Sequence, residues 1–130
     1  DDTIPQITEG TEIFSVSITP QASTNILEFD VLIEGTLSFT TGTFLMGALF
    51  KDGGANAIAA CFGTSQDQST AGGAGQLALK FKVAAGGTVA QTYSFRIGAN
   101  SGSFYLNGNS GGRKLGGVVP AYMQITEKKV

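Results

Sequence analysis

The sequence predicts an all-β fold, an antiparallel β-sandwich of the jelly-roll type with about eight strands. Apolar and polar residues alternate through most of the hydrophobic runs, and this period of two is typical of a half-buried strand. Glycine, with 19 of the 130 residues, clusters between these runs and supplies turns. No window of ten or more residues combines helical spacing with a start cap.

Length and composition indicate one domain. A chain of 130 residues that is 42% hydrophobic can bury a core without cross-links. Residues 1–10 contain Pro5 and little apolar periodicity, so we interpret them as a lead-in arm or linker, and residues 11–130 as a single jelly-roll domain. The single cysteine, Cys61, cannot pair within the chain and is interpreted as a small buried hydrophobic residue.

Two strands are predicted before residue 35. The first begins at Thr11 and ends before Pro20, with its apolar residues on one face. The second, residues 25–34, is the clearest one-sided strand, and its acidic face should lie in water or beside a basic partner. Its inward residues are Leu27, Phe29, Val31 and Ile33, and its outward acids are Glu28, Asp30 and Glu34. Leu37 and Phe39 then allow a short strand before a turn.

The stretch 43–65 does not alternate. Asp52-Gly53-Gly54 predicts a tight turn, and the apolar run 58–62 completes a hairpin. In its first strand, Phe44, Met46, Ala48 and Phe50 line one face, and Leu45 and Leu49 line the other, so both faces are apolar. One face must meet something besides the domain's own core. We therefore predict a homotrimer whose interface contains Phe44, Leu45, Met46, Leu49 and Phe50. In the competing interpretation the chain is a monomer, and the polar loop 63–75 covers that face.

Four further strands follow the loop. They are residues 76–83, with Lys80 and Lys82 outward; residues 88–97; residues 104–106; and a last strand in which Val119, Ala121, Met123 and Ile125 alternate. Pro120 places the last strand at an edge or beside a bulge. The predicted core is formed by Leu27, Phe29, Val31, Ile33, Leu79, Phe81, Tyr93 and Phe95.

The composition argues against catalysis. The chain has no histidine, which removes the commonest general base and metal ligand. Glu28, Asp30 and Glu34 could form a catalytic pair, but a solvated strand face is the favoured interpretation. A net charge of −2 gives no electrostatic footprint for nucleic acid, and no apolar run has the length of a membrane span. We expect no enzyme activity, no metal, no cofactor, no nucleic-acid partner and no membrane insertion.

One polar cluster is a candidate ligand site. The segment NGNSGGRK, residues 107–114, is like a phosphate-binding loop but precedes a strand, so no helix N-terminus would face the anion. Amide, hydroxyl and guanidinium groups beside an aromatic face can hold a sugar, and Arg113 could bind an acidic one. The alternative is a turn with capping amides and a structural arginine, and the absence of tryptophan argues against a flat stacking platform. The candidate residues are Tyr105, Asn107, Asn109, Arg113, Lys114 and Tyr122.

Several segments together resemble a known module. DDTIPQITEGTEI, SITP, TNILEFDV, ALFKDGGANAIAA and FYLNGNSGGRKLGGVVPAYMQITE are similar to the C-terminal β-sandwich module of tailed-bacteriophage tail-fibre and tailspike proteins. The strand order also resembles the trimeric jelly rolls of the complement and tumour-necrosis-factor type. The resemblance covers nearly the whole chain and carries no catalytic residues.

The resemblance implies a function and a location. It implies a non-enzymatic, homotrimeric fibre tip on the virion, or otherwise extracellular, that binds glycan of the host surface, a bacterial polysaccharide, and holds the trimer together. One alternative is a purely structural module for trimerisation or virion decoration. Another is a carbohydrate-binding accessory domain of a secreted hydrolase.

Overall fold

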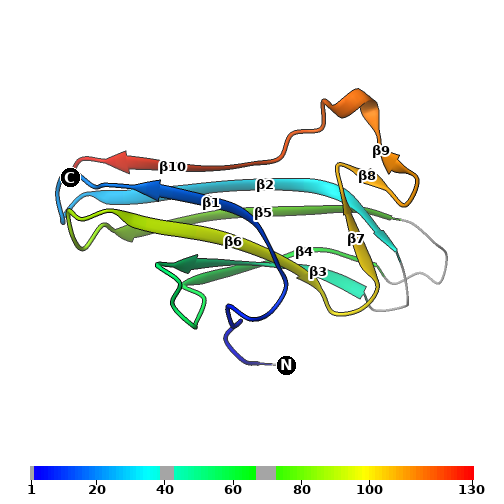
Figure 1. The fold of residues 1–130 in the computed structure, drawn as a ribbon, viewed down its shortest axis with the longest axis horizontal. Helices are drawn as coiled ribbons and strands as arrows, with labels where there is room; N and C mark the ends of the chain where they lie inside the picture. The colour runs from blue at the N-terminus through cyan, green and yellow to red at the C-terminus, as the bar shows by residue number, and fades with distance from the viewer. Residues whose placement is uncertain (1, 39–42, 67–72) are drawn as a thin grey trace.

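The computed structural model of the chain describes residues 2–38, 43–66 and 73–130. Two antiparallel sheets pack face to face as a sandwich (Figure 1). One sheet has the strand order β1-β6-β3-β4, and the other has the order β10-β2-β5, with β7 also paired to β2. The predicted all-β, antiparallel sandwich is confirmed, and within the described residues the one helical element is the short 3-10 turn η1 (Leu115–Gly117).

The bounds of the strands are as follows. The first sheet contains β1 (Thr11–Ile18), β6 (Gln91–Ala99), β3 (Thr43–Lys51) and β4 (Ala59–Gln66). The second contains β10 (Tyr122–Lys128), β2 (Ile26–Ser38), β5 (Gly73–Ala84) and β7 (Ser103–Leu106). A small separate hairpin is formed by β8 (Gly108–Asn109) and β9 (Gly112–Arg113), within the segment predicted as a turn.

Strand β2 is the longest element and organises the second sheet. It pairs with β5 along nearly its full length, with β10 over its first half, and with β7 over its end. The separate short strand predicted around Leu37 is wrong, because Gly35 and Thr36 stay extended and pair with β7, so Leu37 belongs to β2. Phe39 lies outside the described residues, as does the middle of the predicted loop 63–75, which β4 and β5 shorten from both sides.

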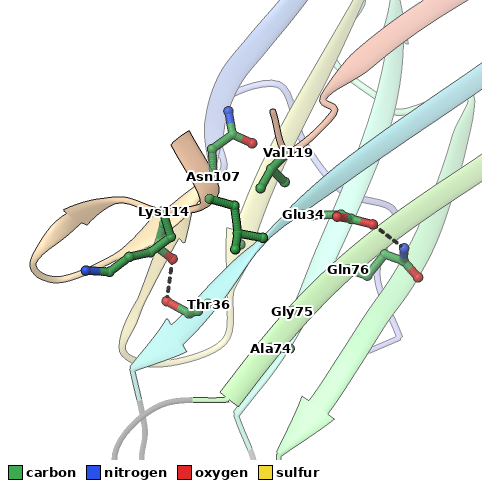
Figure 2. Close-up of a pocket in the computed structure, with 11 residues that line it drawn as sticks. Glu34, Thr36, Ala74, Gly75, Gln76, Asn107, Lys114 and Val119 are labelled. Carbon is green, nitrogen blue, oxygen red and sulfur yellow. Dashed lines mark hydrogen bonds between the residues drawn. The ribbon is translucent and has the colours of Figure 1, made fainter. Parts of the chain in front are cut away.

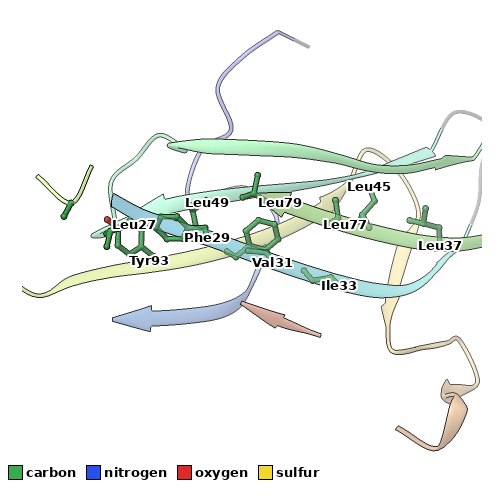
Figure 3. Packing of buried hydrophobic residues seen from close by; sticks show 12 residues of the cluster. Leu27, Phe29, Val31, Ile33, Leu37, Leu45, Leu49, Leu77, Leu79 and Tyr93 are labelled. Atoms are coloured by element: carbon green, nitrogen blue, oxygen red, sulfur yellow. The ribbon is translucent and has the colours of Figure 1, made fainter. Parts of the chain in front are cut away.

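The core lies between the two sheets (Figure 3). In it, the inward residues of β2 pack against those of β3, β5 and β6. The ring of Phe29 meets the ring of Tyr93 edge-on, with centroids 4.7 Å apart. Of the predicted core, Leu27, Phe29, Val31, Ile33, Leu79, Tyr93 and Phe95 are buried, and Phe81 is partly buried against them. The alternating pattern therefore identifies the core correctly.

The hairpin β3–β4 forms as predicted. Asp52 and Gly53 have φ angles of 51° and 69°, and the Gly54 N–H donates to the Lys51 carbonyl. On the inner side of β3, Gly47 leaves room for the Phe95 ring, because a Cβ at Gly47 would lie 2.4 Å from a ring carbon. The strand is thus pressed directly onto the core.

Two predicted strand boundaries are wrong. The strand predicted over residues 88–97 includes Val89 on its inner face, but β6 begins only at Gln91 and Val89 is 74% exposed. The Gln91 side chain donates to the Ala85 carbonyl and holds the connection as a loop. Strand β10 begins at Tyr122, so Val119 lies outside it, because the intervening Pro120 cannot donate to the ladder. Met123 and Ile125 pack against the core as expected.

Candidate functional site

The outward side of the β1-β6-β3-β4 sheet is apolar over β3 and β4. We call this surface the apolar outer face; it consists of Phe44, Met46, Ala48 and Phe50 of β3 with Ala60 and Phe62 of β4. Phe62 lies beside Met46 in the β3–β4 ladder and is 79% exposed. The rings of Phe44 and Phe62 meet edge-on with centroids 5.8 Å apart. Such a pair of aromatic side chains in water is typical of a contact surface.

The residues predicted for a subunit interface divide between the two sides of β3. Phe44, Met46 and Phe50 lie on the apolar outer face, whereas Leu45 and Leu49 are fully buried in the chain's own core. Neither these leucines nor Phe50, which is 1% exposed, has surface left to contact another chain, so the interface we consider below is the accessible part of the apolar outer face, at Phe44, Met46, Ala60 and Phe62. The sequence reasoning missed Phe62, although its position opposite Met46 in the predicted hairpin would have identified it.

The N-terminal arm, residues 2–10, lies across one end of this face. Its backbone pairs with the segment after the hairpin turn: the Ile7 N–H donates to the Ala55 carbonyl and the Ala57 N–H donates to the Pro5 carbonyl, at 2.9 and 3.0 Å. Arg96 holds the other end of the arm, because its guanidinium donates to the carbonyls of Glu9 and Gly10 at 2.8 and 2.9 Å.

The arm and the apolar outer face together form a groove of about 600 Å³. Phe50 and Phe44 line its floor, and the charged groups of Asp2, Glu9 and Arg96 stand along it. Phe50 is only 1% exposed, in contrast to Phe62. The arm therefore lies beside the buried part of the apolar outer face, and Phe62, on the other part, is exposed to solvent.

The outer face of the β10-β2-β5 sheet is charged. Glu28 accepts ion pairs from Lys82 and Lys128 at 2.8 and 2.9 Å, and Asp30 pairs with Lys80 at 3.4 Å. Hydrogen bonds from the two lysines hold the pKa of Glu28 below its usual value. The acidic face of β2 is expected to lie in water or beside a basic partner, and for Glu28 and Asp30 the basic groups are lysines of the same chain.

The residues predicted to bind a ligand lie in separate places. Asn107 and Lys114 line a pocket at the end of β2, while Tyr105 sits on β7 opposite Thr36. The Asn109 side chain accepts from the Gly111 N–H at 2.9 Å, as a capping amide does, and the Arg113 guanidinium lies over Gly117. Tyr122 is on β10, where its hydroxyl donates to Asp30 at 3.4 Å. These six side chains do not converge on one point.

Other reactive groups are few in the described part of the chain. Across residues 2–38, 43–66 and 73–130, no group of three or more His, Cys, Asp or Glu side chains could hold a metal ion. Within the same ranges, no helix has the length and apolar character needed to cross a membrane. The Cys61 thiol is half-buried against the core, and burial raises its pKa.

Comparison with known families identifies the chain's relatives. A family model described as the Pgp3 C-terminal domain matches residues 1–129. Because the match spans nearly the whole sequence, the chain belongs to this family. No curated protein matches the chain.

This finding corrects the interpretation based on sequence segments. The chain is not a bacteriophage tail-fibre or tailspike module, and the predicted role as a glycan-binding fibre tip is wrong, because the matching family is the chlamydial Pgp3 C-terminal domain. The predicted location on a virion is wrong for the same reason. The segments that carried the resemblance are strands and glycine turns, which serve any sandwich of this kind.

Proposed function

We propose that this member of the Pgp3 C-terminal domain family is a non-enzymatic homotrimerisation domain whose contact surface is the apolar outer face. The observation that carries the proposal is the exposure of Phe62, 79%, beside Phe44 on the outer side of a two-sided strand. Moving one phenylalanine side chain fully out of water stabilises a contact by about 1.5–3 kcal/mol. A ring of subunits would gain this at every contact.

The charges around the apolar outer face allow another apolar surface to cover it. The guanidinium of Arg96 is already hydrogen-bonded to the arm, so it does not stand free among the aromatic side chains. The opposite sheet, in contrast, neutralises Glu28 and Asp30 with its own lysines. The apolar outer face is thus the surface that gains most from being covered.

A second exposed apolar patch favours a ring. Leu115 and Val118, 75% and 83% exposed, lie in the loop beyond β9, on the far side of the sandwich from β3 and β4 (Figure 1). A twofold dimer brings the same patch of both subunits together, whereas a ring joins two different patches. The smallest ring that two different patches can close is a trimer. The position of the apolar outer face and the Leu115–Val118 patch on opposite sides of the sandwich therefore supports an assembly of three subunits.

Catalysis has no support in the chemistry of the surface. The chain has no histidine. Of the acids Glu28, Asp30 and Glu34, which could have formed a catalytic pair, the first two are engaged by lysines, which leaves Glu34 without a second free carboxylate among them. A domain that assembles subunits needs no such groups.

The test replaces an exposed residue with an acid, because a substitution at an exposed position leaves the fold of each subunit intact. Phe62→Glu should convert the protein from three times the 13.4 kDa chain mass to a monomer, measured by size-exclusion chromatography with light scattering. Val89→Glu is the matched control, because Val89 is equally exposed but lies outside both patches, and this variant should stay trimeric. A Phe62→Glu protein that keeps the mass of the wild type, with unchanged circular dichroism, would refute the proposed interface.

A further inference from the structure

A pocket of about 490 Å³ lies over the outer face of the β10-β2-β5 sheet, at the end of β2 (Figure 2). Segments far apart in the sequence build it. Glu34 and Thr36 come from β2, Gln76 from β5, and Asn107 from the turn after β7. Leu115 and Val119 of the following loop add apolar wall. Its volume is in the range of about 300–1,000 Å³ that is usual for small-molecule sites.

Asn107 is held in place by its backbone. Its N–H donates to the Glu34 carbonyl at 2.9 Å, and its carbonyl accepts from the Lys114 N–H at 3.1 Å. Its φ angle is 57°, in the left-handed region that asparagine tolerates better than most residues. The next residue, Gly108, is also fixed, because its carbonyl accepts from the Thr36 hydroxyl at 2.8 Å.

The side chain of Asn107 leaves one strong acceptor unused. Its Oδ1 atom is buried and, within the described residues, has no hydrogen-bond partner. A buried acceptor without a donor destabilises the structure, and such atoms in native proteins commonly mark a water or ligand contact. A water or a ligand that brings a donor to this wall of the pocket would satisfy the atom.

Glu34 gives the pocket a negative charge. Its carboxylate is half-buried and accepts from the Gln76 side chain at 2.8 Å, which orients it. Unlike Glu28 and Asp30 on the same strand, Glu34 forms no ion pair with a described residue. Figure 2 shows the Lys114 side chain extending away from Glu34 and Gln76, so its ammonium does not neutralise the carboxylate.

We propose that this pocket binds a small aliphatic ammonium ion. An ammonium group carries only donors, so it matches a carboxylate and an unpaired amide oxygen, and the bond to the carboxylate is charge-assisted. A short hydrocarbon chain would lie against Leu115 and Val119. An anion of the same size would be repelled by Glu34, and a neutral alcohol would gain no ionic contact. This site lies on the opposite sheet from the apolar outer face, and its wall shares Leu115 with the second patch of the proposed ring, so the binding is measured on the Phe62→Glu monomer as well as on the wild type.

The experiment titrates the full chain with n-butylammonium and follows amide chemical shifts by NMR. The proposal expects saturable binding that shifts the amides around Gln76, Asn107 and Leu115, with an affinity about tenfold or more above that of 1-butanol or butyrate. Butanol that binds as tightly as butylammonium, or no saturable binding, would overturn it.

Three variants separate the site from general charge effects. Glu34→Gln keeps the shape of the side chain and should weaken butylammonium binding about tenfold or more. Asn107→Gly keeps the positive φ angle, removes the amide and should also weaken binding. Asp30→Asn removes a carboxylate from the same strand face outside the pocket and should leave binding unchanged. An equal loss in Asp30→Asn and Glu34→Gln would show nonspecific attraction and refute the site.

Discussion

The two outer faces of this sandwich differ in how their side chains are satisfied. On the β10-β2-β5 sheet, Glu28 and Asp30 of β2 form ion pairs with lysines of β5 and β10, so the chain neutralises these two charges itself. On the β1-β6-β3-β4 sheet, Phe44, Met46 and Phe62 have no such charged partner among residues 2–38, 43–66 and 73–130, and Phe44 and Phe62 contact each other. Both sheets send equivalent apolar residues inward. The inward positions thus fix the fold, and the outward positions determine what the domain contacts.

The largest effect should come from a charged residue on the buried side of β3. Leu45→Glu puts a carboxylate without a partner into the core, at a cost of several kcal/mol, which is comparable to the whole stability of a domain of about 5–15 kcal/mol. We expect no cooperative unfolding transition by circular dichroism in urea, whereas Phe62→Glu should give a folded monomer. Leu45→Met preserves volume and serves as the control. A folded Leu45→Glu monomer would show that β3 faces the other way.

The core shared by both sheets gives the next effect. Phe29→Ala removes a ring that packs against Tyr93 and Phe81, and we expect it to lower the free energy of unfolding by about 3–5 kcal/mol. Urea denaturation followed by circular dichroism measures this. A loss below about 1 kcal/mol would contradict the burial of that side chain.

The arm on the apolar outer face should contribute less. Arg96→Ala removes two charge-assisted hydrogen bonds to the arm, and we expect a loss of about 1–3 kcal/mol together with faster hydrogen exchange of the Ile7 and Ala57 amides. Arg96→Lys keeps the positive charge but loses the planar guanidinium that donates to both carbonyls, so it should give an intermediate effect. Unchanged exchange in Arg96→Ala would mean that the arm is held by other contacts.

The charged face should give the smallest effect, and it should depend on pH. On this face, hydrogen bonds from Lys82 and Lys128 lower the pKa of Glu28; on the inward side of β10, a hydrogen bond from Asn25 lowers that of Glu127. A lowered pKa in the folded state contributes stability that is complete above the unfolded value of 4.5 and is lost as pH falls through the folded value. Urea midpoints should therefore decline below that pH.

Two comparisons check the origin of this decline. Glu28→Gln should flatten the dependence on pH, and added salt should weaken it, because the ion pairs are exposed. A slope identical to that of the wild type would exclude the pair of Glu28 with its lysines as a cause.

Alternation was sufficient to predict the core from the sequence, since each inward residue of β2 and most of those of β5 and β6 follow a period of two. Alternation could not predict which side of β3 faces the core, because both sides are apolar. Only the pairing of β3 with β6 turns Leu45 and Leu49 inward. The family was predicted wrongly because short strands and glycine turns are shared by many sandwiches.

The pocket could not be predicted for a different reason. It joins Glu34 to Asn107 through the pairing of β7 with β2, a contact between distant parts of the chain that no local pattern encodes. The sequence predicts Asn107 and Lys114 as polar residues of a turn and Glu34 as part of the solvated acidic face. Glu28 and Asp30 each have a lysine as their cross-strand neighbour on β5, whereas the neighbour of Glu34 is Gln76.

The measurement that tests the central claim most directly is the mass of the wild-type protein in solution. Sedimentation equilibrium across micromolar concentrations should fit a single species of three times the 13.4 kDa chain mass, because the apolar outer face is covered by neighbouring copies. A protein that sediments at the mass of one chain throughout that range would show that Phe62 stays in water and that the domain does not assemble through this face.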